Sequence, residues 1–425
     1  MQPFIAGDSG SPRSNGSRRE LVVDHLAAHR VCRAKRSFTT RRVVFSGRET
    51  LLYGAVRPRA GDLLLAKVDR LGQHGKLETP EGRRAWLHVG DEIIVTYADR
   101  YAPDQFEAQV PPNLAPTQLV ASGGIASQML SRSSDVRRPT DITPIGLIGD
   151  ERGVPVNVAD FALSPCRPPE QRPPTVAVVG TAMNSGKTTT AQGLVHALTR
   201  SGHRVGATKV TGTGAGGDYW IMMDAGAQRM LDFTDVGLAS TYRIDMAVVE
   251  RKSVELLDHL AASECQAIVV EVADGLFQHE TSQLLESELF RSRIDGVLLA
   301  ASDALGAMAG FQRLRLLDVN VLGVAGRLTR SALARREAAG ACSAPILTLE
   351  DLDDSATVLS LFGLESPGFA FDIGSEEVSV LTPDAKPDPV EAVESVAAGA
   401  SPGRWIAPVG WHAGDEPTRP ASATD

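Results

Sequence analysis

The chain has 425 residues with a formal net charge of −9, and 43% of the residues are hydrophobic and 22% charged. This composition supplies enough apolar side chains for a buried core and excludes a chain that is disordered throughout. No stretch reaches the roughly 20 apolar residues of a membrane-spanning helix. The first residues lack a signal-peptide pattern, and the four cysteines are too far apart for a zinc cluster or a disulfide framework. We therefore expect a cytoplasmic protein without a membrane or nucleic-acid partner.

Shifts in composition divide the chain into five parts. We expect a disordered tail over 1–20, a β-rich domain over 21–163, a Pro-rich linker over 164–174, an α/β domain over 175–381 and a disordered tail over 382–425. The linker reads SPCRPPEQRPP, and prolines at this density fit neither a helix interior nor a central strand. It is therefore expected to be an extended connector.

The 21–163 part is dominated by short alternating runs. Those at 62–69, 84–89 and 92–97 are separated by Gly-bearing turns and predict a small antiparallel barrel or sandwich, whereas 125–132 has the spacing of a helix. Residues 29–48 hold seven Lys or Arg and no acid, which we interpret as a solvated face and not a nucleic-acid surface, because the net charge of the chain is negative. The polar segment 99–108 is interpreted as either a domain interface or a substrate contact.

After the linker, apolar runs of strand length alternate with helical patterns. The strands are expected at 176–179, 205–210, 267–272, 296–301, 319–325 and 346–349, and the helices at 187–200, 246–262, 282–290, 304–317, 331–339 and 351–361. This alternation predicts a mostly parallel sheet covered by helices on both faces. The predicted fold class is therefore α/β, preceded by a smaller β-rich α+β domain.

The strongest motif follows the first of these strands, where TVAVVG runs into TAMNS and then GKTTT. A buried strand, a Gly-bearing loop and a GKT opening a helix are the context of a P-loop, whose backbone N–H groups bind phosphate oxygens. The expected nucleotide-binding residues are Gly180, Thr181, Asn184, Ser185, Gly186, Lys187, Thr188 and Thr189. Lys187 would bridge the β- and γ-phosphates, and the Thr188 hydroxyl would bind Mg²⁺.

Five residues separate Gly180 from Gly186, and this spacing resembles the first loop of dethiobiotin synthetase and its relatives among the deviant P-loop ATPases. The resemblance covers about residues 175–350, and proteins of the DUF1611 type share such a core. It implies ATP and Mg²⁺ as cofactors, a second lysine near the γ-phosphate at Lys209 and a metal carboxylate at Glu271. It also implies a metal-binding aspartate between them, either Asp218, expected on a glycine-rich loop, or Asp224, in a helical pattern. We prefer Asp218.

The positions of the candidate site residues along the predicted strands support the same assignment independently of the resemblance. Thr188, Lys209, Asp218 and Glu271 lie at or just beyond the carboxyl ends of predicted strands, where open α/β sheets bind ligands. The expected catalytic residues are Lys187, Lys209 and Glu271, and the expected metal ligands are Thr188, Asp218 and Glu271. Asp274, in the segment EVADG, is interpreted evenly as a site carboxylate or as a helix cap, and Asp303 as the cap of the following helix.

Three functions stay open at this point. The first is an ATP-dependent synthetase that activates a small carboxylate or carbamate by phosphoryl transfer. The second is a nucleotide-controlled switch, and the third is an acyltransferase that uses CoA on an amino acid. A switch of this class carries an extra lysine after the first glycine of the loop, and TAMNS has none, which favours an enzyme. The resemblance also points to a small carboxylate or amino acid as substrate and leaves a homodimer and the choice of ATP or GTP open.

Overall fold

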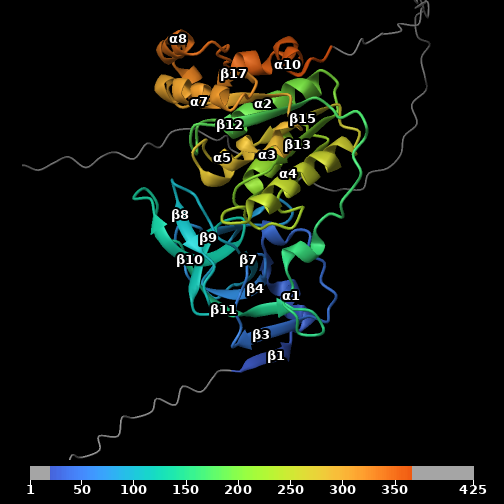
Figure 1. Ribbon diagram of the computed structural model, residues 1–425. Coiled ribbons are helices and arrows are strands. Elements are labelled where there is room, and N and C mark those ends of the chain that lie inside the picture. The colour runs from blue at the N-terminus through green and yellow to red at the C-terminus, as the bar shows by residue number, and fades with distance from the viewer. Residues whose placement is uncertain (1–19, 366–425) are drawn as a thin grey trace, which may run out of the picture. The chain divides into compact units, whose positions relative to one another are not determined.

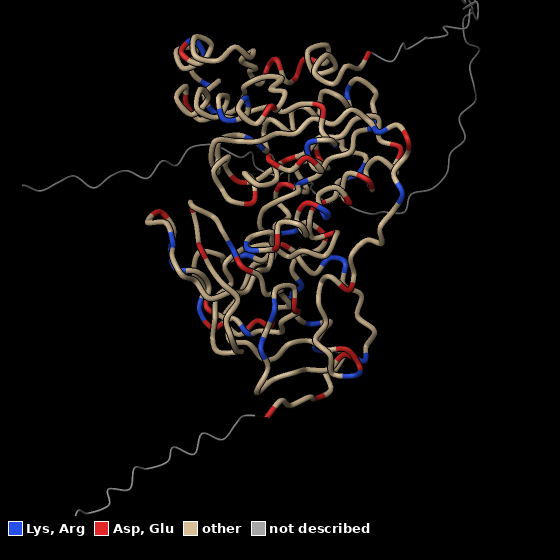
Figure 2. The backbone as a smooth tube through the Cα atoms, in the orientation of Figure 1, with Lys and Arg blue, Asp and Glu red and all other residues tan. Residues whose placement is uncertain are grey.

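The computed structural model describes residues 20–365. The expected C-terminal tail and residues 1–19 of the N-terminal tail lie outside the described residues. The described residues belong to one compact unit and form two large sheets, one antiparallel for the most part and one parallel (Figure 1). Acidic and basic residues are interspersed along both parts (Figure 2). None of the helices described is long and apolar enough to cross a membrane.

The β-rich part contains eleven strands and three short helices before the linker. They are β1 (Leu21–His25), α1 (Ala28–Arg33), β2 (Lys35–Arg36), η1 (Phe38–Thr40), β3 (Thr50–Gly54), β4 (Leu63–Arg70), β5 (Lys76–Glu78), β6 (Arg84–Trp86), β7 (Glu92–Tyr97), β8 (Phe106–Gln109), β9 (Thr117–Ala121), β10 (Ile125–Arg132), β11 (Thr140–Gly149) and η2 (Val158–Phe161). Five of these strands pair in the cycle β4–β7–β10–β9–β11–β4, as expected for a small barrel, although β7 and β10 are parallel.

Both faces of this sheet are buried. Along β4, Leu63 and Leu65 join one apolar cluster, while Leu64 and Ala66 join another on the opposite face. Successive side chains of a strand point to opposite faces, so a nearly continuous apolar run predicts burial on both sides.

The predicted helix at 125–132 is wrong, because these residues form strand β10. Apolar residues at Ile125, Ala126 and Met129 have helical spacing. However, Gly124 has a φ of +104°, and it turns the chain so that β10 pairs with β9 in a hairpin and with β7 and β8 on its other side. Backbone pairing with three strands therefore outweighs the local pattern.

The α/β part follows the predicted alternation closely. Its elements are β12 (Thr175–Gly180), α2 (Lys187–Arg200), β13 (Val205–Lys209), α3 (Gly216–Asp224), β14 (Arg229–Asp232), α4 (Met246–Ala261), β15 (Ala267–Glu271), α5 (His279–Glu286), α6 (Glu288–Arg291), β16 (Gly296–Ala300), α7 (Ala304–Leu316), β17 (Val321–Ala325), η3 (Arg327–Arg330), α8 (Ala332–Ala341), α9 (Leu349–Asp353) and α10 (Ser355–Phe362). All strand pairs in the sheet order β14–β13–β15–β12–β16–β17 are parallel. The predicted fold class is confirmed.

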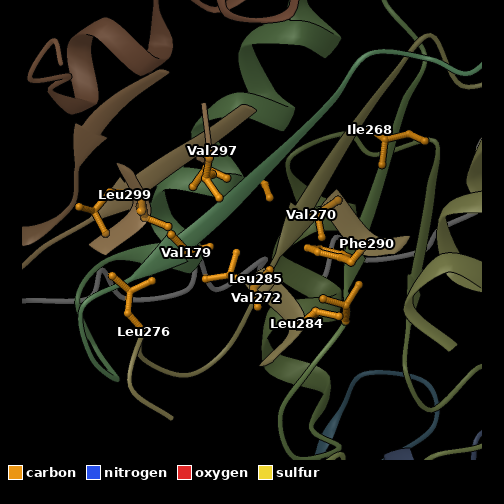
Figure 3. Close-up of a cluster of buried hydrophobic side chains, with 14 of the residues drawn as sticks. Val179, Ile268, Val270, Val272, Leu276, Leu284, Leu285, Phe290, Val297 and Leu299 are labelled. Carbon is orange, nitrogen blue, oxygen red and sulfur yellow. The ribbon is translucent and has the colours of Figure 1, made fainter. Parts of the chain in front are cut away.

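The parallel sheet is covered on both faces by helices. In β12, Val176 and Val178 pack with α2, α3, α9 and α10, whereas Ala177 and Val179 pack with α4, α5, α7 and α8. Figure 3 shows the second of these clusters, where Val179 and Leu299 of the sheet lie near Leu276. This two-sided burial holds the carboxyl ends of β12, β13 and β15 together at one edge.

Several predicted boundaries differ from the structure. The helices expected at 282–290 and 351–361 are each two helices, because Ser287 caps α6 and Asp354 caps α10. The strand expected at 346–349 is a single bridge between Ile346 and Val324, and α9 begins at Leu349. Strand β14 was missed because it has only four residues.

Candidate phosphate-binding site

The loop between β12 and α2 is shaped by its glycines. Gly186, the residue before α2, has a φ of +109°, and a Cβ there would lie 2.9 Å from the Cα of Gly326. A Cβ on Gly180 would lie 2.3 Å from Ser185 Oγ. Gly186 has no side chain to cap α2, so the first backbone N–H groups of this helix are available to an anion.

A cavity of about 470 Å³ opens on this loop and the neighbouring strand ends. It is lined by Met183, Asn184, Gly186, Lys187, Thr188, Thr189, Lys209, Asp218, Glu271, Ala273, Asp274, Arg327 and Arg330. The structure thus brings most of the predicted site residues into one cavity. Gly180, Thr181 and Ser185 do not line it, and Ser185 is fully buried beneath the loop.

Three oxygen-bearing side chains meet at the inner end of the cavity. Thr188 Oγ1 lies 3.0 Å from Glu271 Oε1 and 3.2 Å from Asp218 Oδ1, and the other oxygen of Asp218 accepts a hydrogen bond from Lys209 Nζ. Asp224 is exposed at the far end of α3 and contributes nothing here. The structure therefore places Asp218, not Asp224, with the other candidate metal ligands.

Burial and charge act against each other in this cluster. Burial, together with the nearby carboxylate of Asp218, raises the pKa of Glu271 to about 7. Burial disfavours the charged form of Lys209, but the carboxylates of Asp218 and Glu271 outweigh it and raise the pKa of this lysine. Burial lowers the pKa of Lys187. A phosphate and a divalent cation would supply the charges that balance these groups.

The donor set suits a hard cation that shares its ligands with a phosphate. The described residues contain no group of three or more His, Cys, Asp or Glu that could hold a metal without help. Mg²⁺ commonly takes one or two protein carboxylates and fills its other positions with phosphate oxygens and water. Glu271 Oε2 is buried and has no hydrogen-bond partner, which leaves one oxygen for such an ion. The residues therefore fit Mg²⁺.

Two arginines in the cavity were not predicted. Arg327 and Arg330 belong to η3, directly after β17, and both are exposed. The backbone of Arg327 donates to Ser185 O at 2.9 Å, so η3 is anchored to the P-loop itself. No motif in the sequence marks these two side chains of a short helix as ligand contacts.

The structure also assigns the roles of Asp274, whose interpretation was open, and of Asp303. Asp274 lines the cavity, and the cap of α5 is Gln278, so the interpretation of Asp274 as a helix cap is wrong. Burial raises the pKa of Asp274. Asp303 caps α7 by accepting a hydrogen bond from Gly306 N at 2.7 Å, as expected.

The β-rich part contacts this site through the segment 99–108. Asn184 of the P-loop donates a hydrogen bond of 2.6 Å to Asp104. Arg100 is buried, which lowers its pKa to about 10 against the opposing charge of Asp274. Tyr101 packs against Tyr242 with ring centroids 5.4 Å apart. The structure thus supports the interpretation of this segment as an interface between the two parts.

The basic run at 29–48 is not simply a solvated face. The side chain of Arg41 is only 10% exposed and pairs with Asp232 at 3.0 Å and with Asp235. Asp232 is the last residue of β14, and Asp235 follows the strand. Its guanidinium also lies over the rings of Phe38 and Tyr219. A positive charge here therefore serves to join the β-rich part to the α/β part.

Comparison with known proteins adds little to this geometry. The chain matches no family model and no curated protein. Solved structures similar to part of it include the signal recognition particle 54 kDa protein of Aeropyrum pernix K1 in complex with GDP, with 23% identity over 46% of this chain and 47% of that chain and a TM-score of 0.31. The receptor FtsY of Elizabethkingia anophelis in complex with GDP has 17% identity over 47% of this chain and 67% of its own, with a TM-score of 0.33. The kinase domain of the Escherichia coli tyrosine kinase ETK has 14% identity over 37% of this chain and 68% of its own, with a TM-score of 0.28.

This chain thus spans about half the length of the first of these proteins. The fold is assigned from the structure itself. A parallel sheet whose strand β12 leads through Gly186 into a helix that begins with Lys187 and Thr188 is the P-loop NTPase fold.

Proposed function

We propose that the chain is a Mg²⁺-dependent enzyme that transfers the γ-phosphoryl group of ATP to a small carboxylate or carbamate, as dethiobiotin synthetase does. The observation that carries this proposal is the meeting of Thr188, Glu271 and Asp218 at the carboxyl end of the sheet, beside Lys187 and Lys209. Phosphoryl transfer needs this combination, because cations must offset the charge on the moving group.

Each group has a distinct task in this reaction. The N–H groups of the loop and Lys187 would hold the β- and γ-phosphates, and Thr188, Asp218 and Glu271 would hold Mg²⁺, which polarises the γ-phosphate. Lys209 lies beside Asp218 and would neutralise the charge on the transferred oxygens. A substrate carboxylate oxygen attacks the γ-phosphorus, the bond to the β-phosphate oxygen breaks and ADP leaves. An amine of the substrate then displaces phosphate from the acyl phosphate to form an amide.

A nucleotide-controlled switch is the second candidate. The hydrogen bond between Asn184 of the P-loop and Asp104 of the β-rich part favours it. A bound nucleotide that contacts Asn184 would alter this hydrogen bond and so could change the position of the β-rich part. The two candidates differ in their requirement for a substrate. A synthetase hydrolyses or transfers phosphate rapidly only when its carboxylate acceptor is present, whereas a switch does not respond to small carboxylates.

The test begins with ligand binding and ends with turnover. We would measure the melting temperature with ATP, GTP or acetyl-CoA, each with and without Mg²⁺, because a ligand that binds the folded state raises it by mass action. Release of phosphate would then be followed in the presence of panels of carboxylic acids and amino acids. We expect stabilisation by Mg²⁺-ATP and acceleration by one acceptor class. Stabilisation by acetyl-CoA alone, or no response to any nucleotide, would overturn the proposal.

A further inference from the structure

Helix α3 begins without a cap from its own sequence. Its N-cap position is Ala215, which offers no side-chain acceptor, and its first two residues are Gly216 and Gly217. Glycine is a poor helix former, and uncapped N–H groups at a buried helix start are costly. These features explain why sequence reasoning expected a loop here and placed Asp218 on it, an expectation that the structure corrects.

The missing cap comes from the β-rich part. Glu78, the last residue of β5, accepts a hydrogen bond of 2.7 Å from Gly216 N, although 138 positions separate the two residues. Glu78 is 5% exposed, and its other oxygen lies 3.3 Å from a guanidinium nitrogen of Arg84. A carboxylate at a helix N-terminus satisfies a backbone donor and also complements the positive end of the helix dipole.

The surrounding packing holds α3 against this cap. A Cβ on Gly216 would lie 3.1 Å from both Phe38 and Trp220, and a Cβ on Gly82 would lie 2.7 Å from the Trp220 ring. Gly82 therefore allows the β5–β6 turn to approach Trp220 of α3, and Gly216 allows Phe38 to approach the first residue of this helix. The first turn is fixed from outside by the β-rich part, while its inner side faces the phosphate cavity.

Asp218 is the third residue of α3, so the place of the first turn decides where its carboxylate lies. That carboxylate contacts Thr188 on one side and Lys209 on the other. We propose that Glu78 is a positioning residue for the cation site, acting through Asp218: its carboxylate anchors the start of α3 and so holds Asp218 against Thr188. This inference rests on the proposed binding of Mg²⁺ and a nucleotide at the P-loop.

The experiment measures how nucleotide binding depends on Mg²⁺. Wild type and the variants Glu78→Ala, Glu78→Gln and Asp218→Asn would be titrated with ATP by calorimetry, in EDTA and across a series of Mg²⁺ concentrations. Glu92→Ala is the matched control, because Glu92 also belongs to the β-rich part and its carboxylate pairs with Arg30 and not with α3. Melting temperatures would be recorded for every variant.

Loss of a helix cap changes an equilibrium by about five- to tenfold. We expect Glu78→Ala to raise, by about five- to tenfold, the Mg²⁺ concentration that gives half of the increase in ATP affinity. The ATP affinity in EDTA should be unchanged. Glu78→Gln keeps a carbonyl oxygen for Gly216 N and should recover part of the effect. In the Asp218→Asn background, Glu78→Ala should have no further effect on the Mg²⁺ dependence, because the anchored carboxylate is gone.

The outcomes separate the two proposals. Suppose that Mg²⁺ raises the ATP affinity of wild type, but that Glu78→Ala has the same Mg²⁺ dependence as Glu92→Ala. The positioning role is then wrong and the proposed function stands. If the alanine variant does not fold, Glu78→Gln is compared with Glu92→Ala in its place. A lower melting temperature alone would likewise count against the positioning role. If wild type binds no nucleotide with or without Mg²⁺, the proposed function fails and this inference falls with it.

Discussion

Lys187 Nζ donates a hydrogen bond of 2.9 Å to the carbonyl oxygen of Ala182, so the lysine of the P-loop closes back over its own loop. Met183, Asn184, Gly186 and Lys187 of this segment line the cavity into which a phosphate tail would enter. A bound phosphate would compete with Ala182 for this ammonium group, and it offers a charged acceptor where the carbonyl is neutral.

Lys187→Ala should therefore lose nucleotide affinity while keeping the fold. Hydrogen bonds to charged groups contribute about 1.5–3 kcal/mol, so the dissociation constant for ATP should rise by about 10- to 150-fold. Calorimetric titration measures this, and the melting temperature checks the fold. Lys252→Ala is the control, because Lys252 pairs with Glu255 on α4, away from the cavity. Unchanged ATP affinity in Lys187→Ala would contradict the site.

Glu271→Gln should lower turnover more than it lowers nucleotide affinity. The amide keeps an oxygen that can accept from Thr188, 3.0 Å away, but removes the charge that would hold Mg²⁺ against the transferring group. We expect the turnover number to fall by about 100-fold or more, as when one stabilising group is removed from an active site, with a few-fold change in affinity. Glu286→Gln, which alters an exposed pair with Arg313, should leave both unchanged. Equal losses in turnover and affinity would speak against the metal role.

Arg41→Met should strongly destabilise the protein. The substitution leaves Asp232 and Asp235, both 3% exposed, without their cationic partner. Breaking a buried ion pair by removing one partner costs about 3–5 kcal/mol of the free energy of unfolding. Arg48→Ala, which removes an exposed pair with Glu151, should cost about 0–1 kcal/mol. Urea unfolding followed by circular dichroism compares the two, and similar losses would show that the Arg41 network adds nothing beyond a surface pair.

His74 should make the free energy of unfolding depend on pH below neutrality. Burial and the neighbouring charge of Arg100 lower the pKa of His74 from 6.5 to about 4, and its Nε2 lies 2.9 Å from Val120 O. The unfolded chain therefore binds the extra proton first, so this contribution is complete above pH 6.5 and is lost as the pH falls towards 4.

In His74→Gln, which cannot titrate, the decline of unfolding free energy between pH 6.5 and 4 should become shallower by up to about 3 kcal/mol. His25→Gln, at an exposed position of β1, serves as the control. Parallel pH profiles for wild type and His74→Gln would refute the assignment.

Much of the α/β part could be predicted from the sequence. Its strands are continuous apolar runs and its helices carry clear patterns, so the bounds of α2 match the prediction, and those of α4 differ by one residue. The P-loop residues, Lys209 at the end of β13 and Glu271 at the end of β15 followed from the same order, because carboxyl ends of parallel strands meet at one edge.

What failed depends on contacts between distant segments. The start of α3 is helical only because Glu78 caps it and the β5–β6 hairpin packs on it, and β10 is a strand only because three other strands pair with it. Arg41 lies in a run of seven basic residues that gives no sign of which one is buried against β14. A local pattern carries no information about such partners, which for Glu78 and Arg41 lie more than a hundred positions away.

The ion pairs of Arg41 also bear on how this protein can be divided and recombined. Arg41 precedes Asp232 by 191 positions, so it is synthesised well before the two aspartates that neutralise its charge. A fragment that starts at the proline-rich connector would contain Asp232 and Asp235 but would lack Arg41, their cationic partner. The α/β part on its own would therefore need another cation in place of Arg41 to balance these two carboxylates.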